Sequence, residues 1–182
     1  LNVKSVILFR HGKSDWNANY ISDHERPLSK RGIDASKKMG LYLSRTNQIP
    51  ELILSSTSLR TKSTIKFAIK EGRWLTNIFY DKNIYGGSLS TLIDILKKQD
   101  NNIDKICIVG HEPVLSSFII KSSNSSEWIK FPTGSMAKIN FKTQEWKKIQ
   151  FKLEKSELDW FIKPKSLNQS LSNLPSNSSK DI

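Results

Sequence analysis

The stretch VILFRHG, from Val6 to Gly12, places an arginine, a histidine and a glycine directly after an apolar run. β-branched and aromatic residues dominate that run, which indicates a buried strand over residues 4–9. The histidine has two interpretations. It is either the first surface residue after the strand, or it lies at the carboxyl end of a central strand, where α/β folds bind their ligands.

A second stretch, ICIVGH from Ile106 to His111, has the same form. Each stretch consists of four apolar residues, one transition residue and then a histidine. If both are parallel strands of one sheet, His11 and His111 emerge at the same edge and face each other across one crevice. Either histidine alone is more often structural, whereas two at equivalent strand ends favour a functional pair.

Strands and helices alternate along the middle of the chain. Short β-rich runs are separated by stretches whose apolar residues recur at helical spacing. This alternation predicts an α/β fold, a three-layer sandwich with a mostly parallel central sheet flanked by helices. The expected strands are residues 4–9, 51–56 and 77–81. One helix is expected to begin after Ser29 as its N-cap, and two more are expected over residues 56–70 and 88–98. Residues 105–123 are expected to form a strand, a turn and a helix.

Two features are expected toward the C-terminus. SMAKINF (135–141) and KKIQFKLEK (147–155) are separated by a polar segment and predict an antiparallel hairpin at the sheet edge. Residues 166–182 are rich in Ser and Asn with few large apolar side chains, which predicts a disordered tail. One domain is therefore expected over residues 1–165.

The composition narrows the classes of protein. The 182 residues are 37% hydrophobic, which suffices for one soluble domain with its own core, and no apolar run approaches the ~20 residues of a membrane span. The net charge of +12 comes from scattered lysines that form no stripe with stacking aromatics, so neither nucleic acid nor a membrane is an expected partner. The chain enters its first strand directly and has one cysteine, Cys107, so we expect no signal peptide and a cytoplasmic location. No oligomeric state is predicted.

Three arginines are expected near the two histidines. Arg10 precedes the first histidine, and Arg60 opens the helix that follows the second strand. Arg26 lies in the loop after the first histidine, where a surface ion pair is an equally good interpretation. Guanidinium groups pair bidentately with phosphate oxygens, and helix N-termini add N–H donors. Together these residues predict a site for a tetrahedral dianion, as phosphoryl transfer requires.

Three motifs follow one another along the chain: RHG at 10–12, Arg60 with Thr64 one turn later, and GH at 110–111. In this order they resemble the histidine phosphatase superfamily, also called the phosphoglycerate mutase-like fold. Within it, the short length and DHERPLSKRG (23–32) resemble the small SixA-type phosphohistidine phosphatases. The similarity spans about residues 3–141.

The resemblance implies a function and roles for the site residues. His11 would be the nucleophile, and Arg10, Arg60 and His111 would complete the catalytic set by binding phosphate. Arg26 would be an additional contact. The implied enzyme is a phosphohistidine phosphatase that acts on phosphorylated proteins through a phosphohistidine intermediate. No metal or cofactor is expected, because the arginines supply the positive charge, which should also lower the pKa of His11 and keep its ring neutral.

Two alternatives stay open. RHGKSDWN (10–17) also resembles the opening of phosphoglycerate mutases, which implies a small-molecule phosphomonoesterase or mutase-like enzyme with a small phosphorylated substrate. Against it stands the lack of a long insertion that would enclose a sugar or glycerate. The other alternative is a non-catalytic phosphate-binding module, although binding alone needs no nucleophile.

The sequence contains no evident acid to protonate a leaving oxygen. In mutases that acid lies in a segment resembling Glu-Arg-x-Tyr-Gly, whereas NIYGGS (83–88) keeps Tyr85 and lacks the glutamate. Asp23, Glu112 and Asp81 are candidates, and each is as easily a cap, turn or surface residue. A missing acid suits cleavage of a P–N bond, because imidazole leaves more readily than an alkoxide.

Overall fold

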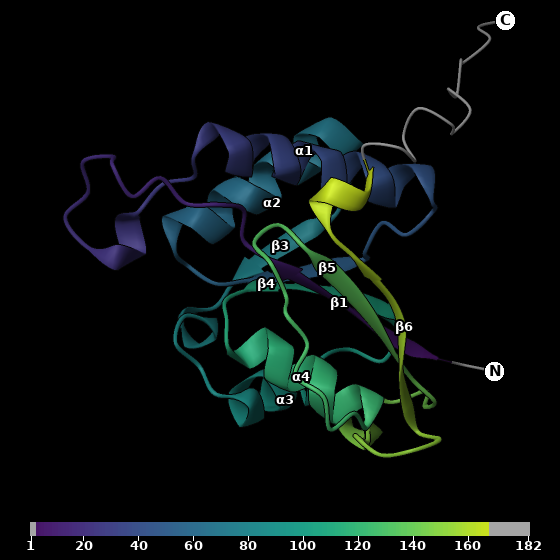
Figure 1. Ribbon diagram of the computed structural model, residues 1–182. Helices are drawn as coiled ribbons and strands as arrows, with labels where there is room; N and C mark the ends of the chain where they lie inside the picture. The colour runs from purple at the N-terminus through teal and green to yellow at the C-terminus, as the bar shows by residue number, and fades with distance from the viewer. Residues whose placement is uncertain (1–2, 168–182) are drawn as a thin grey trace, which may run out of the picture.

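A computed structural model describes residues 3–167 as a central sheet between two layers of helices (Figure 1). The strands are β1 (Lys4–Arg10), β2 (Leu52–Ser55), β3 (Asn77–Tyr80), β4 (Lys105–Gly110), β5 (Met136–Phe141) and β6 (Ser156–Ile162), and the α-helices are α1 (Lys30–Arg45), α2 (Leu59–Gly72), α3 (Leu89–Lys97) and α4 (Val114–Ser123). The strand order is β3-β2-β4-β1-β5-β6. The first four strands are parallel to one another, and β5 pairs antiparallel with both of its neighbours, β1 and β6. The predicted three-layer α/β sandwich is confirmed.

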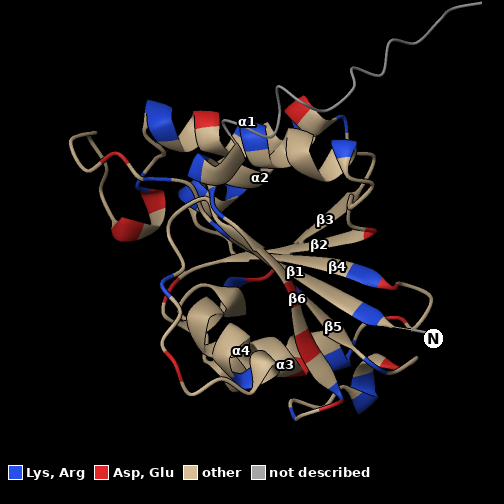
Figure 2. Cartoon of the chain, turned by 45° about the vertical axis from the view of Figure 1, so that its right-hand side comes forward, with Lys and Arg blue, Asp and Glu red and all other residues tan. Residues whose placement is uncertain are grey.

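The path of the chain explains which face each helix covers. From β1 the chain moves through β2 to the edge strand β3 and then turns back to β4. Because β-α-β crossovers are right-handed, this reversal places α1 and α2 on one face and α3 on the other, where α4 joins it (Figures 1 and 2). The predicted cap at Ser29 is confirmed, since its side chain accepts a hydrogen bond from the backbone N–H of Gly32 at 3.2 Å.

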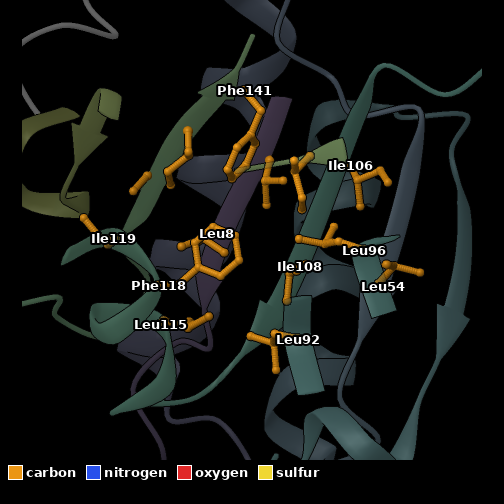
Figure 3. Packing of buried hydrophobic residues seen from close by; sticks show 14 of the residues in the cluster. Leu8, Leu54, Leu92, Leu96, Ile106, Ile108, Leu115, Phe118, Ile119 and Phe141 are labelled. Carbon is orange, nitrogen blue, oxygen red and sulfur yellow. The ribbon is translucent and has the colours of Figure 1, made fainter. Parts of the chain in front are cut away.

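The alternation of side chains along β1 divides the core in two. Val6 and Leu8 pack against α3 and α4, in a cluster that includes Leu92 and Phe118 (Figure 3). Ile7 and Phe9 pack on the other side, against α1 and α2. A strand buried on both faces by apolar residues has a strongly specified register. The residue that follows β1 is therefore held at a fixed position.

The predicted hairpin is correct in kind and wrong in its second strand. β5 pairs with residues 156–162, whereas residues 147–155 form an irregular connection. Ile149 of this connection is buried, but Leu153 on the same strand-like alternation is 75% exposed. Trp146, directly before this connection, belongs to the core cluster on the α3–α4 side, and its indole N–H donates to Ile103 O at 2.8 Å.

The described chain continues slightly past the predicted domain boundary at residue 165. Leu167 is 2% exposed and belongs to the core cluster that contains Met39 and Leu43 of α1. The remainder of the expected tail, residues 168–182, lies outside the described residues, so the tail stays a prediction. Within residues 3–167, no helix has both the length and the apolar composition needed to cross a membrane.

Candidate active site

The two histidines meet because their strands are adjacent and in register. Arg10 is paired with Gly110 across β1 and β4, so His11 and His111 are the next residues on neighbouring strands. The backbone N–H of His11 donates to Gly110 O at 3.2 Å, and the two ring centroids lie 5.3 Å apart. The predicted meeting of the histidines at one sheet edge is confirmed.

A third strand adds a residue that sequence reasoning missed. Ser56 directly follows β2, the other neighbour of β4, and its backbone N–H donates to Val109 O at 3.0 Å. Its hydroxyl lies 2.8 Å from Nε2 of His111. The available signal was positional, since Ser56 follows its strand as the histidines follow theirs.

The ring of His11 is held through one nitrogen, and within residues 3–167 the other nitrogen has no hydrogen-bond partner. Its Nδ1 lies 2.7 Å from Gly12 O, which can only accept a hydrogen bond, so in the neutral ring Nδ1 carries the proton. The Gly12 peptide is fixed in turn, because its N–H donates to the hydroxyl of Thr64 at 2.9 Å. A Cβ on Gly12 would lie 2.5 Å from Gly32 O of α1, which explains the glycine. Nε2 of His11 is thus left with a lone pair.

Arg60 lies in the first turn of α2 and is 5% exposed. One of its terminal nitrogens donates to Asp23 O at 2.6 Å. The other lies 3.0 Å from Asp23 Oδ2 and 3.4 Å from Nδ1 of His111. Since Arg60 can only donate, Nδ1 of His111 accepts, and Nε2 of His111 is the protonated nitrogen that faces Ser56.

The two other arginines also lie beside the histidines. Arg26 is 7% exposed, forms a 2.8 Å ion pair with Asp23 and stacks on Trp16 at 3.5 Å from the ring centroid. Arg10 donates to Phe131 O at 2.7 Å. All the basic residues expected at the site are therefore gathered at this edge of the sheet.

All three of these arginines retain an unused donor. Among the residues that the structure describes, the Nε atoms of Arg10, Arg26 and Arg60 are buried and have no hydrogen-bond partner. A buried donor without a partner is costly, and native structures usually pair it with protein, water or ligand. Three such donors around one histidine pair indicate a site built to receive acceptor oxygens.

Asp23 is the acidic candidate whose carboxylate bonds directly to arginines of this site. Its carboxylate receives hydrogen bonds from Arg26, Arg60 and the hydroxyl of Tyr85, the last at 2.9 Å. Although partial burial raises the pKa of Asp23, the hydrogen bond from Tyr85 and the charge of Arg60 hold it below its ordinary value overall. Asp23 is therefore an ionised partner of the arginines and is poorly suited to donating a proton.

The other two acidic candidates serve local structure. Glu112 accepts hydrogen bonds from the backbone N–H of Ser116, at 3.0 Å, and from the Ser116 hydroxyl, which caps the start of α4. Asp81 accepts from the backbone N–H of Asn83 at 2.8 Å, in a short 3-10 helix. Within residues 3–167, no three His, Cys, Asp or Glu side chains are close enough together to hold a metal ion.

Both histidines are neutral in the free site. Burial is the largest cause that lowers the pKa of His11 to about 4, and the charges of Arg60, Arg10 and Arg26 act in the same direction. Burial, followed by the neighbouring His11, lowers the pKa of His111 to about 3. The expected direction for His11 is therefore confirmed, with desolvation rather than the arginines as the main cause.

These pKa values predict a loss of stability in acid. Both lie below the ordinary histidine value, so unfolded histidines take up protons that the buried rings do not. The stabilisation is complete above about pH 6.5 and is lost as the pH falls toward 4. At pH 5 the expected loss in the free energy of unfolding is ~2 kcal/mol per histidine. Urea denaturation at several pH values should show a weaker pH dependence for His11→Gln/His111→Gln than for the unmodified chain, and equal slopes would contradict the shifts.

The sheet order and the ring of arginines define an α/β sandwich whose strand ends carry a paired-histidine anion site. A model of the histidine phosphatase superfamily (branch 1) matches residues 6–83. The chain is also 30% identical over 137 residues to an uncharacterized protein of Mycobacterium tuberculosis, a match that covers 70% of this chain and 84% of that protein. The chain belongs to the histidine phosphatase superfamily.

Two further comparisons extend this assignment. A chloroplastic, uncharacterized protein of Arabidopsis thaliana is 33% identical over 117 residues, or 59% of this chain, and the match spans about half of that relative (54%). The fold is that of the putative phosphohistidine phosphatase SixA from Agrobacterium tumefaciens, with a TM-score of 0.74 and 22% identity over 88% of this chain and 98% of that one. The resemblance seen in the sequence is confirmed, and the family supports a phosphatase activity.

Proposed function

We propose that the chain is a phosphohistidine phosphatase that acts on phosphorylated proteins, with His11 as its nucleophile. The observation that carries this proposal is the group of three buried, unpaired Nε donors beside a histidine whose Nε2 has a free lone pair. Guanidinium N–H groups match the oxygens of a phosphoryl group and stabilise the charge that spreads over them during transfer. The likeness in fold to SixA supports the same class of substrate.

The proposed reaction has two steps. Nε2 of His11 attacks phosphorus, the N–P bond to His11 forms, and the bond from phosphorus to the substrate imidazole breaks with its electron pair remaining on that ring. A water oxygen then attacks the phosphorus on His11, and the P–Nε2 bond breaks with its electron pair returning to Nε2. The two protons of the water stay on the product, which leaves as inorganic phosphate (H2PO4–). Arg10, Arg26 and Arg60 bind the oxygens in both steps. A bound dianion favours the charged form of the His111 ring. Binding therefore raises the pKa of His111 and gives the site one more N–H donor.

The arrangement of side chains supports P–N cleavage over cleavage of an alkyl phosphate. The three carboxylates that the sequence offered are engaged as an ionised partner of arginines or as helix caps. An alkoxide needs a proton to leave. The ring of a phosphohistidine that is protonated on its second nitrogen needs none, because it leaves as neutral imidazole. The fully buried Cys107 is consistent with the predicted cytoplasmic location, which stays a prediction.

Chelation tests the proposed chemistry directly. Exhaustive treatment with EDTA is expected to leave the turnover of a phosphohistidine peptide unchanged, because arginine side chains provide the positive charge. The measurement is kcat before treatment, after treatment, and after adding magnesium or manganese. A loss of activity that either ion restores would overturn the proposed chemistry, and failure to turn over phosphohistidine at all would overturn the proposed substrate.

A further inference from the structure

We propose that a basic groove beside the histidines binds an acidic segment of the phosphorylated protein substrate. The groove has a volume of about 840 Å³ and lies between the first half of α1, the loop before β5 and the segment after β6. Among the described residues, twelve line the groove, and seven of these are Lys or Arg, against one carboxylate, Asp34. We call this feature the basic groove. The proposal rests on the proposed function, because it places the acidic segment next to the phosphohistidine.

The basic groove adjoins the nucleophile through Gly134. A Cβ on this residue would lie 3.1 Å from Pro164 and 3.3 Å from Ala35, two lining residues from opposite walls. The backbone N–H of Gly134 donates to Arg10 O at 3.1 Å and to His11 O at 2.9 Å. A bound segment would therefore lie one peptide away from the strand end that carries His11.

The three walls come from distant parts of the sequence. Lys30 and Arg31 of α1 form one wall, and Lys130 lies on the loop. Lys163 precedes the last short helix, Pro164–Ser166, and Lys165 lies within it. Figure 1 shows this yellow helix against α1, in agreement with contacts between the two. Lysines that are scattered in the sequence are thus concentrated at one place in the fold.

Five of the basic side chains in the groove carry charges that stability does not explain. Among the described residues, none of the five basic side chains just named forms an ion pair with a carboxylate, and all five are exposed. Lys30 and Arg31 occupy the first turn of α1, which has no acidic residue. Positive charge there opposes the helix dipole and destabilises the helix. Mutual repulsion and an unfavourable helix position are tolerable where an anionic partner offsets them.

The chemistry of the lining favours a polypeptide over nucleic acid. Besides the charged residues, the part of the chain that the structure describes lines the groove with Ala35, Pro132, Pro164 and Thr133, and with no aromatic side chain. Proteins that bind single strands combine basic grooves with aromatic residues on which bases stack. Carboxylates of an acidic peptide need only the ammonium and guanidinium groups that the groove presents.

Direct binding tests the proposal separately from catalysis. The probe is a labelled, unphosphorylated Asp/Glu-rich peptide, compared by fluorescence anisotropy with a matched peptide that carries Asn and Gln. The variant Lys30→Glu/Arg31→Glu/Lys165→Glu should weaken binding of the acidic peptide about tenfold or more at low salt, because each reversal replaces an attraction by a repulsion. Acidic residues in the first turn of α1 suit the helix dipole, so this variant should remain folded.

A variant with the same change in net charge provides the control. Lys142, Lys152 and Lys155 are exposed and lie at the opposite edge of the sheet, where β5 ends beside the start of β1. Their triple replacement by Glu should leave most of the affinity intact. Both variants should retain turnover of p-nitrophenyl phosphate, which probes the histidine site alone.

Three results would overturn the proposal: equal binding of the acidic and neutral peptides, equal weakening by both triple variants, or tighter binding of a single-stranded oligonucleotide to the basic groove. Because the peptide carries no phosphate, a failure of the proposed phosphatase reaction leaves this binding result readable. Conversely, if the unmodified chain turns over phosphohistidine but does not bind the acidic peptide, the proposed role of the basic groove is wrong and the proposed function stands.

Discussion

A His11→Ala variant is expected to carry no phosphoryl group after turnover and to lose activity by about 10⁴-fold or more, since the covalent route has no other nucleophile. The unmodified chain, quenched during turnover of a labelled substrate, should carry phosphate that survives alkali and is lost in acid. This expectation follows from the ring of His11, whose Nδ1 is fixed on Gly12 O, while Nε2 has no hydrogen-bond partner in the part of the chain that the structure describes. Its lowered pKa, about 4, keeps that nitrogen unprotonated at neutral pH.

The chain offers a matched control for this experiment. It contains three histidines, and His24 lies outside the pair, 2.9 Å from the hydroxyl of Thr57 through Nε2. A His24→Ala variant should still take up acid-labile label. Label found on serine, aspartate or Cys107 would contradict the mechanism. Cys107 is the least suited of these, because complete burial raises the pKa of its thiol far above neutrality.

The second large effect concerns the leaving group. The ratio of kcat/KM for a phosphohistidine peptide to that for an alkyl phosphate should be at least ~10²–10⁴, the contribution that a general acid usually makes. An activated aryl phosphate should lie between the two. The reason is structural, because Asp23 is held ionised by Arg26, Arg60 and Tyr85 and has no proton to give.

Replacing the carboxylates separates this explanation from its rival. Asp23→Asn should change kcat for phosphohistidine by only a few-fold, and Asp81→Asn, which alters a carboxylate in a local cap, serves as the matched control. Efficient turnover of 3-phosphoglycerate or a sugar phosphate, abolished by Asp23→Asn alone, would identify Asp23 as a general acid. The protein would then belong with the small-molecule phosphatases and mutases of its family.

The parts of the fold that the sequence predicted correctly are those set by short-range pattern. The apolar run before His11 and its counterpart before His111 each mark a strand buried on both faces, so the meeting of the two rings follows from parallel pairing. The position of β6 could not be predicted from this short-range pattern. Residues 147–155 alternate as a strand does, yet pairing with β5 selects residues 156–162, a choice made by contacts across the sheet.

The parts of the site that escaped prediction depend on loops brought together from distant positions. Asp23 looked equally like a turn residue, because its partners Arg60 and Tyr85 are 37 and 62 residues away. The basic groove escaped for the same reason, because its walls come from three separate parts of the chain, residues 13–38, 130–133 and 163–165. The composition shows that lysine is in excess, but only the folded chain shows that several lysines lie together in one groove.

The register between β1 and β4 has a consequence for how the enzyme loses activity. Successive residues of a strand point to opposite faces, so a slip of one residue would turn His11 and His111 away from each other. The pair therefore tolerates no partial misalignment, and its geometry is as durable as the two innermost strands that carry it. On heating, the spacing of the two rings should persist until the sheet itself melts, whereas contacts that depend on the long loop before α1 can be lost earlier. Loss of the histidine pair should therefore coincide with cooperative unfolding, whereas phosphate binding by Arg26, which this loop carries, weakens at a lower temperature.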